Sequence, residues 1–338
     1  MPHDNNARTV IITGASAGIG RAIAHRFARG GDRVGLIARD ETALMDVQRE
    51  LQAANAKAVE WEAADMSNAT AVFTAADRLE RRLGLIDIWI NDAMETVFST
   101  VANIDPAEFR RVTEVTYLGF VYGTMAALKS MRPRRRGRII QIGSALAYRG
   151  IPLQAAYCGA KHAIRGFTDS LRTELLHEKS PITVSIVELP AVNTPQFDWA
   201  RAHIPHTPRP MGKPIEPEVV ADAVFRVAQG SSREYWLGLQ TILTILGNSI
   251  APAYLDRYLA RKAVAGQQTS TPVLTGREDN LDHPVTALHR TRGSFSVGSS
   301  PHAPLVEGQV ARAACALIGA ALFFAVGAVA GAKRRRSR

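Results

Sequence analysis

Short apolar runs alternate with longer amphipathic stretches from Arg8 to about Leu239. Continuous apolar runs are typical of strands in a sheet that is covered on both faces. The runs predicted to be strands are 9–13, 33–38, 58–63, 86–91, 138–142, 183–188 and 234–239. Helices are expected between them, beginning near Gly18, Glu41, Asn68, Asp105, Gln154 and Glu216. Repeated strand–helix alternation implies right-handed crossovers, so we expect an α/β fold with a doubly wound, Rossmann-type parallel sheet.

The character of the sequence changes after residue 239. Residues 240–265 have a helical pattern, and residues 266–309 are rich in Gly, Ser, Thr and Pro, which is typical of a flexible connector. We therefore expect one large domain with a helical C-terminal extension. The predicted divisions are an N-terminal tail (1–7), a dinucleotide-binding catalytic domain (8–265), the connector (266–309) and an apolar segment with a basic tail (310–338).

The apolar segment is a candidate for membrane association. Residues 313–332 are uncharged and would span about 30 Å as a helix, the thickness of a bilayer core. Nine of them are Ala and three are Gly, however, and the basic residues 333–338 would favour the cytoplasmic side. A spanning helix, an interfacial or re-entrant helix, pairing with a partner helix, and an Ala-rich helix docked on protein all remain open.

Glycines follow the first predicted strand in the stretch Thr13-Gly14-Ala15-Ser16-Ala17-Gly18-Ile19-Gly20. A turn this tight requires residues without a side chain, and so does the close approach of backbone N–H groups to a pyrophosphate. The following helix N-terminus adds positive potential. Because a strand precedes this loop and a helix follows it, we favour a dinucleotide site over a simple tight turn. Its predicted residues are Gly14, Ser16, Gly18, Ile19 and Gly20.

Arg39 directly follows the second predicted strand, which ends in Ala38. Sites for NAD carry an acidic residue here that bonds the ribose hydroxyls. A carboxylate would repel the additional phosphate of NADP, whereas a guanidinium binds it through charge-assisted hydrogen bonds. Arg39 therefore predicts NADP(H) as the cofactor, and a solvated surface arginine is the alternative interpretation.

Ser144, Tyr157 and Lys161 are the candidate catalytic residues. Ser144 follows the fifth strand, and ligands of doubly wound sheets bind beyond the carboxyl ends of the strands. Tyr157 and Lys161 share one face of a helix. The ammonium, together with an oxidised nicotinamide, is expected to lower the pKa of the phenol from its ordinary value of about 10. Tyr157 would then exchange a proton with the substrate, Ser144 would hold the substrate oxygen, and Lys161 would also bond the nicotinamide ribose.

The glycine loop, the strand-end Ser144 and a Tyr-xxx-Lys motif thirteen residues later form an ordered set. This set resembles the classical short-chain dehydrogenase/reductase family over residues 8–240. The resemblance implies catalysis by Ser144, Tyr157 and Lys161, and it implies an Asp65 that lies against the adenine ring. A turn-forming aspartate explains Asp65 nearly as well.

Four further positions can be compared with the family, and two of them match. Asn91 and Ala93 agree with its Asn-Asn-Ala-Gly segment, whereas Asp92 and Met94 depart from that segment. A side chain in place of the last glycine is expected to narrow the cleft near the cofactor.

Three more candidates come from the same resemblance. Pro190 and Thr194 correspond to the segment that touches the nicotinamide carboxamide. Thr116 stands where the family has its fourth catalytic residue, an Asn that holds a water linking the lysine to solvent. A threonine hydroxyl can hold a water too, with shorter reach and fewer hydrogen bonds.

The predicted function is NADP(H)-dependent interconversion of a carbonyl and an alcohol by hydride transfer, with Tyr157 as general acid/base. The membrane segment favours an apolar small-molecule substrate, bound under a loop at about 193–214. The alternative hypothesis is a catalytically idle, NADP(H)-binding, membrane-associated sensor or scaffold, since Asp92, Met94 and Thr116 depart from the family. By resemblance, a homodimer or tetramer is plausible.

Charge, cysteine content and histidine positions limit the possible partners, location and metal content of the protein. The formal net charge is +10, concentrated in residues 132–138 and 333–338, but no nucleic-acid-binding motif accompanies these clusters, so no nucleic-acid partner is predicted. Two distant cysteines, Cys158 and Cys315, exclude a disulfide framework. No secretory signal is recognisable in residues 1–7, so we expect a cytoplasmic catalytic domain that is membrane-associated through the C-terminus. The histidines lack the partners of a metal site, and no metal is predicted.

Overall fold

The structure is a computed structural model that describes residues 7–318. Its central sheet has eight strands in the order β12-β10-β7-β6-β4-β1-β2-β3. All neighbours pair in parallel except β12, which runs antiparallel to β10. The strands are β1 (Thr9–Thr13), β2 (Arg33–Ala38), β3 (Ala58–Ala63), β4 (Ile88–Asn91), β6 (Arg138–Ile142), β7 (Thr183–Glu188), β10 (Glu234–Leu237) and β12 (Leu305–Glu307). The predicted doubly wound parallel sheet is confirmed, and β12 is an addition to it.

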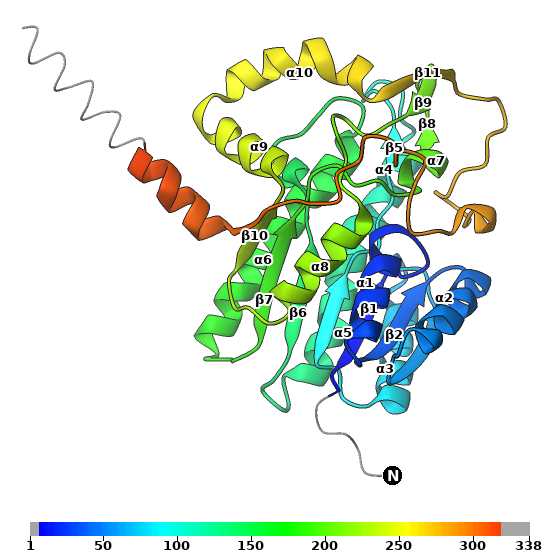
Figure 1. The fold of residues 1–338 in the computed structure, drawn as a ribbon, viewed down its shortest axis with the longest axis vertical. Helices are drawn as coiled ribbons and strands as arrows, with labels where there is room; N and C mark the ends of the chain where they lie inside the picture. The colour runs from blue at the N-terminus through cyan, green and yellow to red at the C-terminus, as the bar shows by residue number, and fades with distance from the viewer. Residues whose placement is uncertain (1–6, 319–338) are drawn as a thin grey trace, which may run out of the picture.

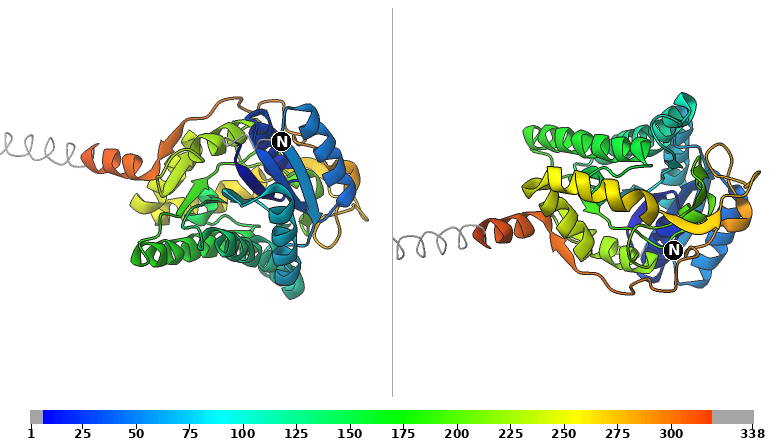
Figure 2. Two further views of the ribbon diagram at one scale, coloured as in Figure 1. Left: turned by 90° about the horizontal axis from the view of Figure 1, so that it is seen from below. Right: turned by 90° about the horizontal axis from the view of Figure 1, so that it is seen from above.

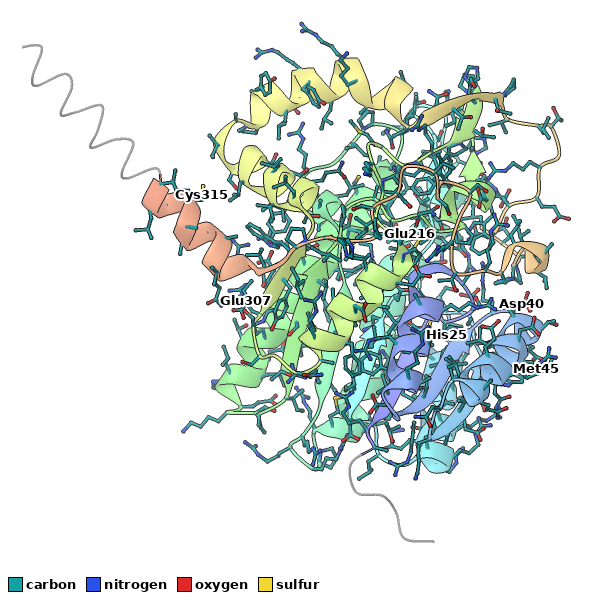
Figure 3. All side chains as sticks on the ribbon, in the orientation of Figure 1. His25, Asp40, Met45, Glu216, Glu307 and Cys315 are labelled. Atoms are coloured by element: carbon teal, nitrogen blue, oxygen red, sulfur yellow. The ribbon has the colours of Figure 1, made fainter. Side chains whose placement is uncertain are left out.

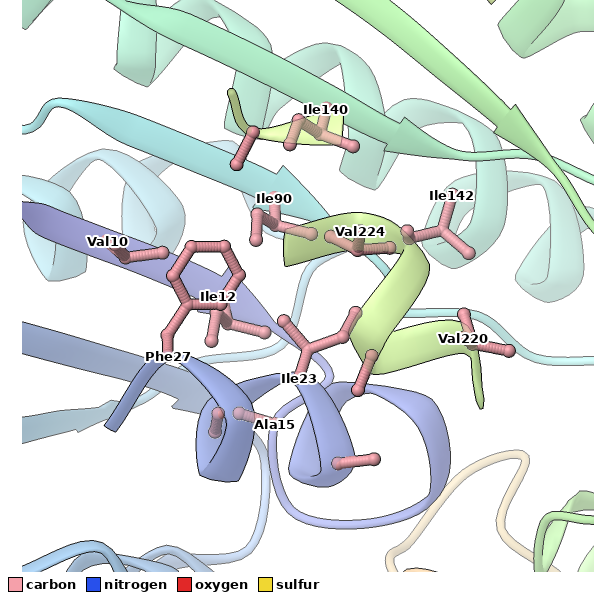
Figure 4. Close-up of a cluster of buried hydrophobic side chains, with 14 of the residues drawn as sticks. Val10, Ile12, Ala15, Ile23, Phe27, Ile90, Ile140, Ile142, Val220 and Val224 are labelled. Carbon is pink, nitrogen blue, oxygen red and sulfur yellow. The ribbon is translucent and has the colours of Figure 1, made fainter. Parts of the chain in front are cut away.

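Helices cover both faces of the sheet (Figures 1 and 2). The principal helices are α1 (Gly18–Arg29), α2 (Glu41–Ala53), α3 (Ala69–Leu83), α4 (Pro106–Thr113), α5 (Gly119–Met131), α6 (Ala155–His177) and α8 (Pro217–Val227). Apolar side chains of α1, α2 and α8 pack on one face, and those of α3, α5 and α6 pack on the other. Figure 4 shows the first layer, in which Ile23 and Phe27 of α1 and Val220 and Val224 of α8 lie against the strands.

The helix starts follow signals that are visible in the sequence. Asp40, Asn68 and Asp105 each accept a hydrogen bond from a backbone N–H in the first turn of α2, α3 and α4. Such a cap stabilises a helix end by about 1 kcal/mol. The six predicted helices all begin at or one residue after the expected position.

Smaller elements complete the edge of the sheet where its strands end. Two short ladders pair β5 (Val97–Phe98) with β8 (Arg201–Ala202) and β9 (His206–Pro208) with β11 (Gln268–Pro272). The helical pattern of 240–265 is confirmed as two helices, α9 (Leu239–Ile250) and α10 (Pro252–Gly266). The break falls at Pro252, whose missing N–H and fixed φ suit the first position of a new helix. The remaining pieces are α7 (Gln196–Trp199), a π-helical turn at Glu114–Leu118, and 3-10 turns at Ala145–Ala147 and Thr286–Leu288.

Residues 266–309 differ from the flexible connector that their composition predicts. They contribute β11 and β12, and the side chains of Leu281 and Val285 are buried against the domain. The segment returns across the carboxyl edge of the sheet before it reaches β12 (Figure 1). A few apolar residues that dock at long sequence distance order the segment, and composition alone does not reveal such contacts.

The chain is helical from 308 to 318. Arg312 fixes the start of this helix, since its guanidinium lies 2.6 Å from the Glu234 carboxylate and 2.9 Å from the Tyr148 hydroxyl. Within residues 7–318, no helix has the length and apolar character needed to cross a membrane. Most of the apolar segment 313–332 lies outside the described residues, so its membrane role stays a prediction.

Candidate active site

Two adjoining cavities lie beyond the carboxyl ends of the central strands. The larger, of about 590 Å³, contains the catalytic candidates, and the smaller, of about 150 Å³, lies over the glycine loop. Ile19, Asp92, Met94 and Thr194 line both, so the two cavities are neighbours. This is the edge at which doubly wound sheets bind ligands.

The predicted catalytic residues meet in the larger cavity. Ser144 follows β6, and Tyr157 and Lys161 lie one turn apart on α6. Ser144 lies close enough to the Tyr157 hydroxyl to lower its pKa, and Ser144 Oγ accepts the Leu146 N–H at 3.1 Å. Lys161 Nζ donates to the Ile142 carbonyl at 2.7 Å and lies 5.5 Å from the centre of the Tyr157 ring. The backbone of β6 therefore fixes the ammonium beside the phenol.

The protein's own groups act against the expected low pKa of Tyr157. Burial raises the pKa of this phenol above its ordinary range, and Cys158 and the carboxylates of Asp92 and Glu188 raise it further, whereas the Ser144 hydrogen bond lowers it. Burial also lowers the pKa of Lys161, against the attraction of the same two carboxylates. An isolated phenol in a dry pocket holds its proton. The surrounding protein therefore favours the protonated form of Tyr157.

Asp92 and Glu188 are two buried carboxyl groups whose role the sequence did not indicate. Burial raises the pKa of Glu188 to about 8, and this side chain accepts the Ser144 N–H at 2.6 Å. Burial also raises the pKa of Asp92, although the Lys161 charge and the Gly20 N–H oppose this effect. Glu188 therefore holds the backbone of Ser144, and Asp92 places a proton-binding group beside Lys161.

Thr116 lies near this site but its hydroxyl is already used. Its Oγ1 donates to the Glu95 carbonyl at 3.0 Å and accepts the Glu95 N–H at 2.9 Å. The side chain is fully buried within the π-helical turn and lines neither cavity. The geometry thus makes Thr116 a positioning residue for the segment that follows β4.

The glycine loop has the geometry expected where backbone N–H groups approach a pyrophosphate closely. Gly14 and Gly18 have positive φ angles of 72° and 56°. A Cβ on Gly20 would lie 2.4 Å from the Gly14 carbonyl oxygen, so only glycine fits there. Gly14, Ser16, Gly18 and Ile19 line the smaller cavity, whereas Gly20 lies beneath the loop and supports it.

Arg39 lies in the smaller cavity, where the connector and Glu95 already contact it. Its guanidinium donates to the carbonyls of Asn280 at 2.5 Å and Leu281 at 3.2 Å. Arg39 Nη2 is also 2.7 Å from Glu95 Oε1, without the alignment of a hydrogen bond. Burial raises the pKa of Glu95 to about 8 despite the nearby charges of Arg39 and Arg111.

Other connector contacts close the same cavity. The Gly18 N–H, at the start of α1, donates to the Arg290 carbonyl at 3.0 Å. The Thr286 hydroxyl donates to Asp40 at 2.6 Å, and Figure 3 shows Asp40 beside this part of the connector. The connector therefore occupies donors that would face the phosphates of a dinucleotide.

The remaining candidates divide between the cavities and the interior. Ala93 and Asp65 line the smaller cavity, and Asp65 is held by Arg111 at 2.6 Å. Pro190 and Thr194 line the larger one. Asn91 lines neither cavity and instead bonds buried groups including Gln141 and Thr124 in the interior, so its part is structural.

Sequence reasoning missed the wall opposite the catalytic residues. Side chains of α9 and α10, including Leu243, Leu255 and Leu259, line the larger cavity together with Phe98 and Phe197. Residues 194–212 of the predicted substrate loop contribute as well. The helical pattern of 240–265 indicated the helices but not that their apolar side chains face the site. Residues 7–318 hold no group of His, Cys, Asp and Glu placed to share a metal ion.

Comparisons with known proteins agree with this geometry. A family model described as short chain dehydrogenase matches residues 8–204. An uncharacterized oxidoreductase of Bacillus subtilis is 30% identical over 284 residues, which cover 83% of this chain and 80% of the relative. The 3-dehydrosphinganine reductase of Danio rerio is 28% identical over 301 residues, which cover 87% of this chain and 84% of the relative.

A solved structure is similar in fold as well. It is an alcohol dehydrogenase from the archaeon Thermococcus sibiricus, complexed with 5-hydroxy-NADP. The TM-score is 0.60 at 26% identity, and the match covers 68% of this chain and 96% of that one. The family model spans more than half of the 338 residues and includes Ser144, Tyr157 and Lys161. The chain belongs to the short-chain dehydrogenase family of oxidoreductases.

Proposed function

We propose that the protein reduces an apolar carbonyl compound to an alcohol, or catalyses the reverse reaction, with NADP(H) as hydride carrier. The observation that carries this proposal is that Ser144, Tyr157 and Lys161 together line a largely apolar cavity of about 590 Å³. A cavity of this size accepts a substrate much larger than a small polar ketone. The Danio rerio relative, a 3-dehydrosphinganine reductase by name, supports a long apolar substrate.

The residues present fit NADP(H). Gly14, Ser16, Gly18 and Ile19 form the cradle under the smaller cavity, and Arg39 is a cation in the same cavity that could bind a ribose phosphate once the connector releases it. No aspartate or glutamate occupies the end of β2, where sites for NAD carry one. The bound cofactor supplies the hydride, and the chain supplies the proton and the orientation of the substrate.

The chain's part in the reaction follows from the positions of Ser144, Tyr157 and Lys161 in the larger cavity. Ser144 and Tyr157 bind the substrate oxygen, and the burial that raises the pKa of Tyr157 keeps its proton in place until charge develops on that oxygen. The proton then passes from the Tyr157 hydroxyl to the alkoxide. Lys161 stabilises the resulting phenolate, and its ammonium is held by the Ile142 carbonyl. In the reverse direction the phenolate accepts the proton of the alcohol.

The test combines a nucleotide titration with a substrate series on the whole protein. We expect NADPH to bind at least tenfold more tightly than NADH, a difference of about 1.4 kcal/mol. A series of ketones of increasing chain length should be reduced with rising kcat/KM. Tyr157→Phe should bind NADPH normally and lose turnover. If neither NADPH nor NADH binds the folded protein, the proposal loses its basis.

One observation favours a second candidate, the NADP(H)-binding sensor or scaffold. The connector occupies both the Gly18 N–H and Arg39, so nucleotide binding requires that the connector rearranges. A sensor uses that rearrangement as its output and needs no turnover. A biological role that persists in Tyr157→Phe would favour this second candidate over the enzyme.

A further inference from the structure

The larger cavity opens between α9 and α10 on an apolar part of the molecular surface. Leu243 and Tyr258 both line the cavity and are nevertheless 61% and 45% exposed, so they form its rim. One helical turn earlier on each helix, Leu239 and Tyr254 are exposed as well. The Tyr254 and Tyr258 rings are stacked, with their centroids 6.4 Å apart. We call this set of four residues the mouth face.

Clusters of exposed apolar side chains around an opening are uncommon on a protein that meets only water. Tyrosine rings with exposed edges are typical of the boundary between lipid and water, where an apolar body meets a polar surface. The mouth face therefore has the composition of an interfacial surface, and the cavity behind it is lined mainly by apolar atoms.

Positive charge lies beside the mouth face. Arg257, Arg261 and Lys262 of α10 are exposed and make no ion pair within residues 7–318. The acidic residue of the same helix, Asp256, is already paired with Arg149. Uncompensated basic residues next to exposed apolar ones are the combination that anionic phospholipid surfaces attract.

The helix at residues 308–318 begins close to α9. The helix that begins at 308 leaves the domain beside α9 (Figures 1 and 2), and Cys315 lies on its outer turns (Figure 3). Arg312 binds Glu234 at the start of this helix and so fixes its origin. The uncharged sequence 313–332 and the basic residues 333–338 follow from this point.

We infer that the mouth face docks on the surface of an anionic phospholipid bilayer, so that an apolar substrate passes from the lipid directly into the cavity. The docking itself does not depend on the chemistry, and only the direction of substrate access rests on the proposed function. A substrate that moves along this path never crosses water, which removes the cost of transferring its apolar surface. The mouth face thus selects substrates by their partitioning into lipid.

The test places a reporter on the mouth face of the full chain. In a Cys315→Ser background, Tyr254→Cys carries an environment-sensitive dye, and Cys158 is buried and does not compete for the label. Leu85→Cys is the matched control, since Leu85 is 58% exposed against 65% for Tyr254 but precedes β4, at the amino ends of the strands. Vesicles contain phosphatidylcholine with or without phosphatidylglycerol. NADPH titration of every variant monitors the cofactor site separately.

We expect a blue shift of the dye at position 254 with vesicles that contain phosphatidylglycerol, and none at position 85. A triple variant Arg257→Gln, Arg261→Gln, Lys262→Gln should weaken binding at least tenfold in low salt. Three results would overturn the inference. The protein could fail to bind vesicles, or it could bind them without a change in the emission of the dye at position 254. The emission could also shift without lipid, by an amount that grows with protein concentration. The last would assign the mouth face to a second copy of the chain. If NADPH binding survives these results, the proposed function stands without the docking.

Discussion

Leu281 anchors the connector over the smaller cavity, and removing its side chain should increase the affinity for NADPH. The residue is 1% exposed and packs with Val97, Val112 and Ala156, in a cluster separate from the two layers of the main core. Leu281→Ala should therefore loosen the connector without unfolding the sheet. Truncation of a buried leucine costs about 2–5 kcal/mol, and we take about 2 kcal/mol because the connector can relax into solvent.

The size of the change in NADPH affinity follows from competition between the connector and the nucleotide for the same groups. The closed connector occupies the Gly18 N–H and the Arg39 guanidinium, so the observed affinity is the intrinsic affinity reduced by the fraction of open molecules. Destabilising the closed form by about 2 kcal/mol increases that fraction roughly 30-fold while the closed form still predominates. The dissociation constant for NADPH should fall by up to the same factor.

Energy transfer from tryptophan to the nicotinamide measures this affinity, and stopped-flow mixing measures the rate of association. Leu274→Ala is the control, since Leu274 belongs to the same connector but is 72% exposed and should change nothing. The affinity for NADH should rise as well, because the same opening frees the Gly18 N–H, which would meet the phosphates of either nucleotide. Unchanged or weaker binding in Leu281→Ala would refute the reasoning and show that the closed connector contributes to the bound state.

Three other substitutions test the site. Asp92→Asn should shift the pH profile of kcat, because it removes a carboxyl whose pKa burial raises beside Lys161; an unaltered profile would exclude Asp92 from proton transfer. Glu95→Gln should raise the Tm relative to the unsubstituted chain, and this difference in Tm should grow as the pH rises from about 5 to 8. Because burial raises the pKa of Glu95, the protonated carboxyl is compatible with the fold at low pH, and stability is lost as this carboxyl ionises. A Tm difference that stays constant with pH would contradict this explanation. Gly20→Ala should weaken NADPH binding more than tenfold, because its Cβ would overlap the Gly14 carbonyl, whereas Gly166→Ala, which meets open space, should leave binding unchanged.

The parts of the fold that the sequence predicted correctly are those with local signals. Continuous apolar runs identified the seven parallel strands, and capping residues such as Asp40 and Asn68 marked the helix starts. The strand-end position of Ser144 and the helical spacing of Tyr157 and Lys161 were sufficient to bring these three together. Each of these signals extends over only a few residues, because backbone hydrogen bonding and side-chain direction within one element determine them.

The parts that were missed depend on contacts between distant segments. The bonds between Arg39 and the connector join residues more than 240 positions apart, and the connector's composition gives no sign of them. The pKa of Tyr157 was expected to be lowered by Lys161 together with an oxidised nicotinamide, whereas burial and the carboxylates that follow β4 and end β7 raise it. Burial and long-range electrostatics are properties of the assembled site, and a motif of five residues does not contain them.

The two departures at positions 92 and 116 have a common physical explanation in this site. A family asparagine at 116 would leave an amide to hold a water, whereas the Thr116 hydroxyl is taken up by both backbone groups of Glu95. Proton exchange near Lys161 then requires another polar group, and Asp92 is a titratable side chain that lines both cavities. Burial raises the pKa of Asp92, and the Lys161 charge opposes this, so the carboxyl can both hold and release a proton where an asparagine cannot. We therefore propose that the loss of an amide at position 116 and the gain of a titratable carboxyl at position 92 are one change in the path of the proton, and not two separate defects.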